Sequence, residues 1–147
     1  MIRKFLMVSL LVAAGVADAS AQSDPIAERK LLMKTHADIW YGDINKMMKG
    51  ETPYNPARVT EALNAIINSS KKAGPLFSDN AKTGGGTRAL PTIWENRDDF
   101  NARLAKLGSD ATAALAKVND EAAFKAAQPG INNNCNQCHA AYRARGN

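Results

Sequence analysis

Five consecutive residues near the carboxyl end of the chain have the types and spacing of a reactive site. Cys135-Asn136-Gln137-Cys138-His139 has the pattern C-x-x-C-H and contains the only two cysteines among the 147 residues. Thiols three residues apart lie on one side of a helical turn, so both can add to the two vinyl groups at one edge of a haem. His139 follows directly and can place an imidazole nitrogen below the iron as the proximal ligand. The motif therefore predicts one haem c, attached covalently through Cys135 and Cys138.

Other uses of paired cysteines fit the sequence less well. A zinc site needs about four ligands, and the only other histidine is His36, with no second cysteine pair. A thioredoxin-like redox pair needs a βαβ unit, whereas the sequence is poor in β-branched alternation. A structural disulfide would join distant segments rather than two positions of one pentapeptide. Chance occurrence of C-x-x-C-H is the remaining alternative to haem attachment.

The first 21 residues have the three zones of a secretory signal peptide. Arg3 and Lys4 form a basic start, residues 5–16 are apolar, and Ala19-Ser20-Ala21 is a small-residue cleavage site. The apolar run is too short to span a bilayer as a permanent helix. We expect residues 1–21 to be removed on export to the periplasm, leaving a single domain of residues 22–147 without a membrane span.

The formal net charge of +5 falls to +4 when the signal peptide, with two basic residues and one acidic residue, is removed. This modest surplus favours docking to acidic partners, and no basic run interleaved with aromatic residues indicates nucleic-acid binding. We also find no nucleophile with an organised base, no paired carboxylates and no phosphate-binding loop, so the sequence does not predict an enzyme.

Apolar residues recur at helical spacing in most of the mature chain. Four stretches show this period: residues 24–49, 55–74, 91–118 and 119–145. Asn55 before Pro56 is typical of a helix N-cap, and Asn119 or Asp120 caps the last helix. Pro129-Gly130 is expected to kink that helix or break its hydrogen bonds.

The first helix shows how these stretches should pack. Its bundle-facing stripe is expected to consist of Ile26, Lys30, Met33, Ala37, Trp40, Ile44 and Met47. Residues 75–90 contain three consecutive glycines and no period, which predicts a long crossover loop. Four amphipathic helices bury their stripes by packing together, so we predict an all-α, antiparallel up-down four-helix bundle with the haem held near the C-terminal helix.

An exported helical chain that ends in CNQCHAAYRAR resembles the cytochrome c-prime family, the class II c-type cytochromes, which are familiar four-helix bundles. Three further segments carry the resemblance: the R-x-x-x-M of Arg29 to Met33, GETPYNP at 50–56 and PTIWENRDDF at 91–100. Many five-coordinate members have Gln directly after this Arg, whereas this chain has Lys30. In this respect the local sequence RKLLMK is more similar to the low-spin cytochrome c-556 branch.

The resemblance implies roles for three residues besides the haem motif. Arg29 would lie near a haem propionate, Met33 would occupy the distal position over the iron, and Arg143 would lie beside His139. A His/Met pair gives a six-coordinate haem suited to electron transfer with periplasmic redox proteins. An empty distal position would instead leave a five-coordinate iron that binds gases such as nitric oxide. The resemblance also implies that the protein can form a homodimer.

Other side chains near these positions have simpler interpretations. His36 is an alternative ligand, although a lone histidine on the flank of a stripe is more often partly buried. Met47 and Met48 are expected to pack in the core. Trp40 and Trp94 supply large buried areas, and either one could touch the porphyrin.

Overall fold

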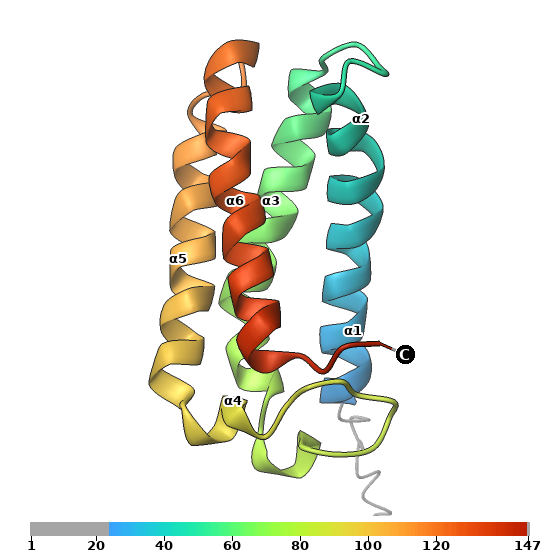
Figure 1. Ribbon diagram of the computed structural model, residues 1–147, viewed down its shortest axis with the longest axis vertical. Helices are drawn as coiled ribbons and strands as arrows, with labels where there is room; N and C mark the ends of the chain where they lie inside the picture. Colours follow the sequence, from blue (N-terminus) through green and yellow to red (C-terminus); the bar gives the residue numbers. More distant parts are fainter. Residues whose placement is uncertain (1–23, 147) are drawn as a thin grey trace, which may run out of the picture.

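The structure is a computed structural model that describes residues 24–146, so the expected signal peptide lies outside the described residues. The elements in chain order are α1 (Pro25–His36), the π-helix η1 (Ala37–Ile44), α2 (Asn45–Met48), α3 (Pro56–Ala73), the short 3₁₀ helices η2 (Gly74–Leu76) and η3 (Asp79–Ala81), α4 (Thr92–Glu95), α5 (Arg97–Leu115) and α6 (Glu121–Tyr142). Figure 1 shows α1, η1 and α2 as one continuous rod, with successive long helices running in opposite directions. The predicted antiparallel four-helix bundle is confirmed.

The helices begin where the sequence supplies caps. The side chain of Asn55 accepts a hydrogen bond from the backbone N–H of Arg58 at 3.1 Å, directly before Pro56. Asp120 likewise accepts from Ala123 N at 2.9 Å at the start of α6. These side chains satisfy backbone donors that have no partner inside the helix, which explains why the chain turns into helix at these residues.

Buried apolar side chains pack together in the half of the bundle that contains α2, the start of α3, the end of α5 and the start of α6. We call this the closed half; its helices form the upper part of the ribbon in Figure 1. Trp40 and Phe124 belong to this cluster and meet edge to face, with ring centroids 6.4 Å apart. The indole N–H of Trp40 donates to Asn132 Oδ1 at 2.6 Å, so its polar end is also satisfied. The buried members of this cluster are Trp40, Ile44, Met47, Val59, Ala62, Leu63, Ile66, Ala111, Ala114, Val118, Phe124 and Ile131.

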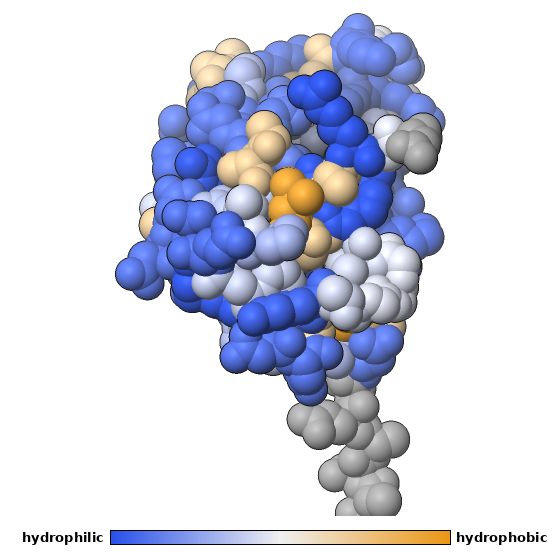
Figure 2. Space-filling view, turned by 60° about the horizontal axis from the view of Figure 1, so that its bottom comes forward, coloured by the Kyte–Doolittle hydropathy of each residue, from blue (hydrophilic) through white to orange (hydrophobic). Residues whose placement is uncertain are grey.

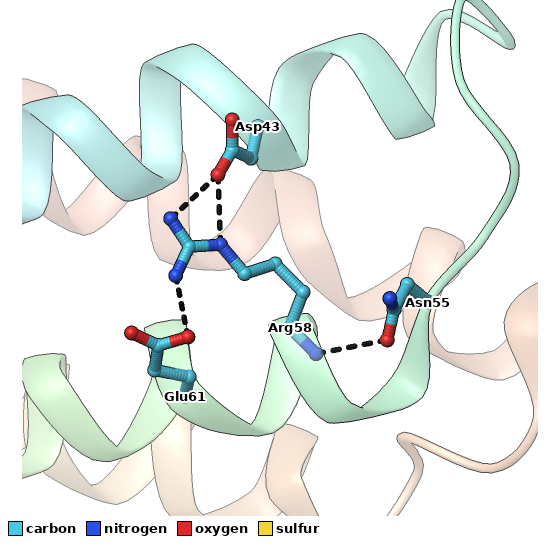
Figure 3. Close-up of polar contacts among 4 residues, drawn as sticks. All are labelled: Asp43, Asn55, Arg58 and Glu61. Atoms are coloured by element: carbon cyan, nitrogen blue, oxygen red, sulfur yellow. Dashed lines mark hydrogen bonds and ion pairs between the residues drawn. The ribbon is translucent and has the colours of Figure 1, made fainter.

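A polar clamp on the surface holds η1 against α3 (Figure 3). The guanidinium of Arg58 donates to Asp43 Oδ2 through Nε at 2.7 Å and lies 2.6 Å from it through Nη2. Nη1 donates to Glu61 on the next turn of α3. These two carboxylates raise the pKa of Arg58, with the Glu61 hydrogen bond as the largest cause. Arg58 therefore joins α3 to η1 through Asp43 and also contacts Glu61 on the next turn of α3.

A smaller apolar cluster lies at the opposite end, around the start of α5 and the end of α6. Its buried members are Ala73, Ile93, Phe100, Leu104 and Tyr142. The crossover between α3 and α5 covers this end of the bundle (Figure 1). Gly84, Gly85 and Gly86 all adopt positive φ within it, which explains why three glycines are needed there. No helix within residues 24–146 is both long and apolar enough to cross a membrane.

The structure corrects three details of the sequence interpretation. The third helix is interrupted at Asn96, whose φ of −126° and ψ of 51° separate α4 from α5. Residues 37–44 form a π-helix, which the 3.6-residue period does not indicate. Helix α6 itself runs through Pro129-Gly130 as one element, as expected, and both residues are exposed, so water can satisfy the carbonyl that the proline leaves free. Finally, α6 ends at Tyr142 rather than near Arg145, because the following residues pair with the crossover.

Candidate functional site

The C-x-x-C-H motif occupies the last two turns of α6. Cys135 and Cys138 are free, half-buried thiols on one side of the helix. Burial raises the pKa of both thiols, and for Cys138 the neighbouring Cys135 and Asp99 add to the rise while Arg103 opposes it. Burial thus favours the protonated thiol over the thiolate at both positions.

A cavity of about 300 Å³ opens beside Cys138, between α6, α1, α3, α5 and the crossover. Its lining residues are Arg29, Lys30, Met33, Ala73, Phe77, Gly86, Thr87, Arg88, Ala89, Ile93, Phe100, Leu104, Cys138, His139, Tyr142 and Arg143. The inner wall is aliphatic and aromatic, whereas the charged lining residues are all cations. Figure 2 shows hydrophobic residues exposed within a hydrophilic surround on the face at this end of the bundle.

His139 projects from α6 into the wall of this cavity. Its ring has no hydrogen-bond partner among the described residues, although the backbone carbonyl accepts from Arg143 N at 3.1 Å. Burial lowers the pKa of His139, and the positive charges of Arg143 and Arg88 lower it further, with a smaller contribution from His36. The side chain is therefore held as a neutral imidazole, the form that binds a metal ion.

Met33 lines the same cavity from α1. Its side chain is 38% exposed, and it belongs to neither of the two apolar clusters. Within the predicted bundle-facing stripe, Trp40 and Ile44 are buried as expected, and Lys30 and Met33 face the cavity between the helices. The stripe is wrong at Ala37, which is exposed and does not line the cavity. Met47 is buried in the closed half and Met48 packs against it, which confirms the core role expected for both. The thioether of Met33 is thus available to a group in the cavity.

These residues suit a flat, largely apolar group with a metal at its centre and anionic edges, which is the chemistry of haem. Comparison with known proteins agrees. The family model described as Cytochrome C' matches residues 24–143. The chain belongs to the cytochrome c' family.

Similar proteins include both types of class II cytochrome. Cytochrome c' of Rhodopseudomonas palustris is 43% identical over 135 residues, which is 92% of each chain. Cytochrome c-556 of Agrobacterium fabrum is 33% identical and covers 97% of this chain and 96% of its own. The solved structure of the R. palustris cytochrome c' matches with a TM-score of 0.81 at 42% identity, covering 86% of this chain and all of that chain.

Membership of the cytochrome c' family establishes the cofactor as a covalently attached c-type haem. Cys135 and Cys138 are the only cysteines in the sequence that can form the attachment. This is a family of electron carriers and gas binders. The two activities differ in what lies on the distal side of the iron.

Arg29 makes contacts in this cytochrome that the sequence does not indicate. Its side chain is only 5% exposed, and its guanidinium donates to Leu76 O at 3.0 Å, Ala81 O at 2.9 Å and Thr87 Oγ1 at 2.7 Å. It also lies 4.5 Å from the centre of the Phe77 ring. Burial lowers the pKa of Arg29, and Asp24 partly opposes this effect. Arg29 therefore fastens the crossover to α1 as well as lining the cavity, and Nε and one Nη1 hydrogen remain for another partner.

Arg88 is a cavity residue that sequence reasoning missed. It lies in the crossover, and an isolated antiparallel bridge between Ala89 and Arg143 brings it beside the end of α6. Ala144 N donates to Arg88 O at 2.8 Å, and Leu90 N donates to Tyr142 O at 3.0 Å. The pairing joins residues more than fifty positions apart, which no local pattern in the sequence could reveal.

The remaining candidates lie outside the cavity. Nε2 of His36 contacts Ser69 Oγ and lies 3.3 Å from Ala65 O, so this histidine is partly buried against α3. Trp40 lies in the closed half, whereas Trp94 meets Phe77 edge to face with ring centroids 6.0 Å apart. Neither tryptophan lines the cavity, although Trp94 contacts the cavity residue Phe77.

Proposed function

We propose that this protein is a periplasmic one-electron carrier whose haem iron is bound by His139 on one side and Met33 on the other. The supporting observation is that Met33 lines the cavity and lies outside both apolar clusters, although methionines in helix stripes are usually core residues. When bound, haem c supplies an iron that alternates between the ferrous and ferric states. The exchange involves one electron and no proton.

In this proposal, His139 and Met33 have different roles as ligands of the iron. His139 is held neutral by burial and by neighbouring cations, so it can bind without first losing a proton. The thioether of Met33 is a soft, neutral ligand that favours the ferrous state. With both positions filled, little rearrangement accompanies the change of charge, which suits rapid electron transfer.

We further propose that Arg143 and Arg29 contribute to the surroundings of the haem propionates, since both line the cavity. Residues 22–147 would form the mature domain, exported after cleavage of residues 1–21, and able to associate as a homodimer. N-terminal sequencing of protein from the periplasmic fraction is expected to begin at Gln22, and sedimentation would give the oligomeric state.

A second candidate function is the binding of small gases at an open distal position. This alternative is supported by the higher identity to a cytochrome c' of R. palustris, 43%, than to the cytochrome c-556 of A. fabrum, 33%. In this alternative, Met33 contacts the haem without binding the iron.

Replacement of Met33 distinguishes the two candidates. The unmodified protein is expected to show sharp, split visible bands on reduction that do not change when carbon monoxide is added. Met33→Ala should give broad bands that shift with the gas, because the distal position is then free. Met48→Leu, on the same rod but packed against the closed half, is the matched control and should leave the spectrum unchanged. Carbon monoxide binding by the unmodified ferrous protein would overturn the proposal in favour of gas binding.

A further inference from the structure

Positive charge gathers at the opening of the haem cavity. Four cations line it, namely Arg29, Lys30, Arg88 and Arg143, and no aspartate or glutamate is among the lining residues. Lys30, Arg88 and Arg143 are exposed, and Arg145 is exposed two residues beyond the end of the bridge. The opening is therefore a cationic surface on a protein whose overall charge surplus is modest.

These exposed cations form no ion pair with any described residue. Seven cations elsewhere on the surface are paired with carboxylates, namely Lys34, Lys49, Arg58, Lys82, Arg103, Lys106 and Lys125. Other exposed lysines, such as Lys46 and Lys117, are also unpaired among the described residues, but they do not line the haem cavity. Unpaired charges around an opening produce a field that extends into solvent, whereas paired charges largely cancel.

The backbone fixes the position of this charge. Arg88 and Arg143 are held side by side by the bridge, through the hydrogen bonds of Ala144 to Arg88 and of Leu90 to Tyr142. Lys30 is held toward the crossover by a hydrogen bond from Nζ to Gly85 O at 2.9 Å. The cations are thus displayed at one place, beside the residues that carry the haem.

The haem cancels only part of this charge. It has two propionates, which can neutralise two of the four lining cations. The opening then keeps a positive balance, and Arg145 adds to it. An acidic surface is the complement that such an opening attracts.

We propose that the cationic opening formed by Lys30, Arg88 and Arg145 is the docking surface for a redox protein with an acidic face. The inference rests on the proposed electron-transfer function and names the class of partner. Docking would bring the partner's one-electron centre to the haem edge. The ferrous protein becomes ferric as the oxidised partner gains one electron, and the reverse exchange restores it.

The test compares electron exchange with charged probes in stopped-flow experiments on the haem-loaded protein. The probes are ferricyanide, the cationic oxidant tris(phenanthroline)cobalt(III), and reduced flavodoxin as a small acidic redox protein. Arg88→Gln combined with Arg145→Gln removes two charges at the opening. Lys46→Gln combined with Lys117→Gln removes two exposed, unpaired charges at the other end of the bundle, in α2 and in the turn before α6.

We expect the variant with both Arg88→Gln and Arg145→Gln to react about fivefold more slowly than the unmodified protein with ferricyanide and with flavodoxin at low ionic strength. The same variant should react faster with the cationic cobalt complex. Salt should weaken both effects, because it screens exposed charges. The control variant should differ from the unmodified protein much less. A change in potential or fold would move ferricyanide and cobalt rates in the same direction, so opposite directions identify a charge effect at the opening.

Three outcomes would overturn the docking proposal: equal effects of the two variants, shifts in the same direction with both oxidants, or an unchanged flavodoxin rate. Binding to phosphatidylglycerol vesicles together with an unchanged flavodoxin rate would assign the surface to a membrane instead. The electron-carrier proposal has a separate test, because it fails if the unmodified ferrous protein binds carbon monoxide. The rates with the two oxidants can be measured whichever ligands bind the iron, so the two proposals can fail independently.

Discussion

The two halves of the bundle use similar helices for different purposes. In the closed half, Trp40 and Phe124 are 2% and 0% exposed and apolar side chains fill the space between all four helices. At the other end, which we call the haem half, the helices leave a cavity, and Met33 on α1 faces it with 38% of its surface exposed. The first rod of the bundle belongs to both halves. The comparison indicates that the closed half stabilises the fold, while the haem half gives up some packing to leave room for the cofactor.

Truncation of a large side chain in the closed half should have the largest effect on stability and none on the haem. Phe124→Ala removes a fully buried ring that contacts both Trp40 and Tyr54. We expect it to lower the free energy of unfolding by about 3–5 kcal/mol, as is usual when a buried aromatic side chain is truncated. Urea denaturation monitored by circular dichroism would measure the loss.

The matched control for this change is Leu31→Ala, because Leu31 is 63% exposed and its truncation should alter stability by less than about 0.5 kcal/mol. Below the unfolding transition, the visible spectrum of Phe124→Ala should equal that of the unmodified protein. A changed ligand set in the folded variant would show that the halves are not independent.

Glycine substitutions in the crossover, which lies in the haem half, should have a smaller effect on stability than Phe124→Ala. Gly84 and Gly85 have φ of 87° and 54°, so alanine is strained at either position. A Cβ at Gly84 would meet nothing within 4 Å, whereas one at Gly85 would lie 2.9 Å from Ile26 Cγ2. Gly84→Ala should therefore cost about 1–2 kcal/mol from backbone strain alone, and Gly85→Ala should cost more. Equal losses in urea denaturation would mean that the crossover moves away from α1 without cost.

The closed half was more predictable from sequence than the haem half, for a physical reason. Its helix caps and buried stripe depend on neighbours within one or two turns, so Asn55, Asp120 and Trp40 could be identified from local patterns. The C-x-x-C-H motif is equally local. Arg88 could not be found, because its place in the cavity depends on pairing between the crossover and the residues after α6.

Arg29 shows a related limit of sequence reasoning. The R-x-x-x-M pattern places it one turn from Met33, and the structure brings both to the cavity. Its three hydrogen bonds to the crossover depend on how residues 76–87 fold, and that segment has no periodic pattern. Similarly, the π-helix η1 and the break at Asn96 change the register of helices whose apolar spacing looks regular. Local sequence thus identifies the haem-attachment motif and Met33 as a candidate ligand, and tertiary contacts supply the rest of the cavity lining.

The smallest expected effect concerns His36, one turn after Met33 at the contact between α1 and α3. Its Nε2 contacts Ser69 Oγ, and burial lowers its pKa while the Ala65 carbonyl partly opposes the shift. A lowered pKa means that the unfolded chain binds a proton more readily than the folded protein. Stability from this histidine is therefore fully present above the unfolded value of about 6.5 and declines as the pH falls through that value toward the folded pKa.

His36→Gln keeps a hydrogen-bond donor and removes the titration. We expect the unmodified protein to lose more unfolding free energy than this variant between pH 7 and pH 5, measured by urea denaturation of the haem-loaded proteins. Carboxylates and His139 are common to both proteins, so the difference between the two pH profiles isolates His36. Parallel profiles would show that the His36 ring takes up a proton in the folded state without cost. The contact between α1 and α3 beside the cavity would then be open to water, as the haem half is, rather than sealed like the closed half.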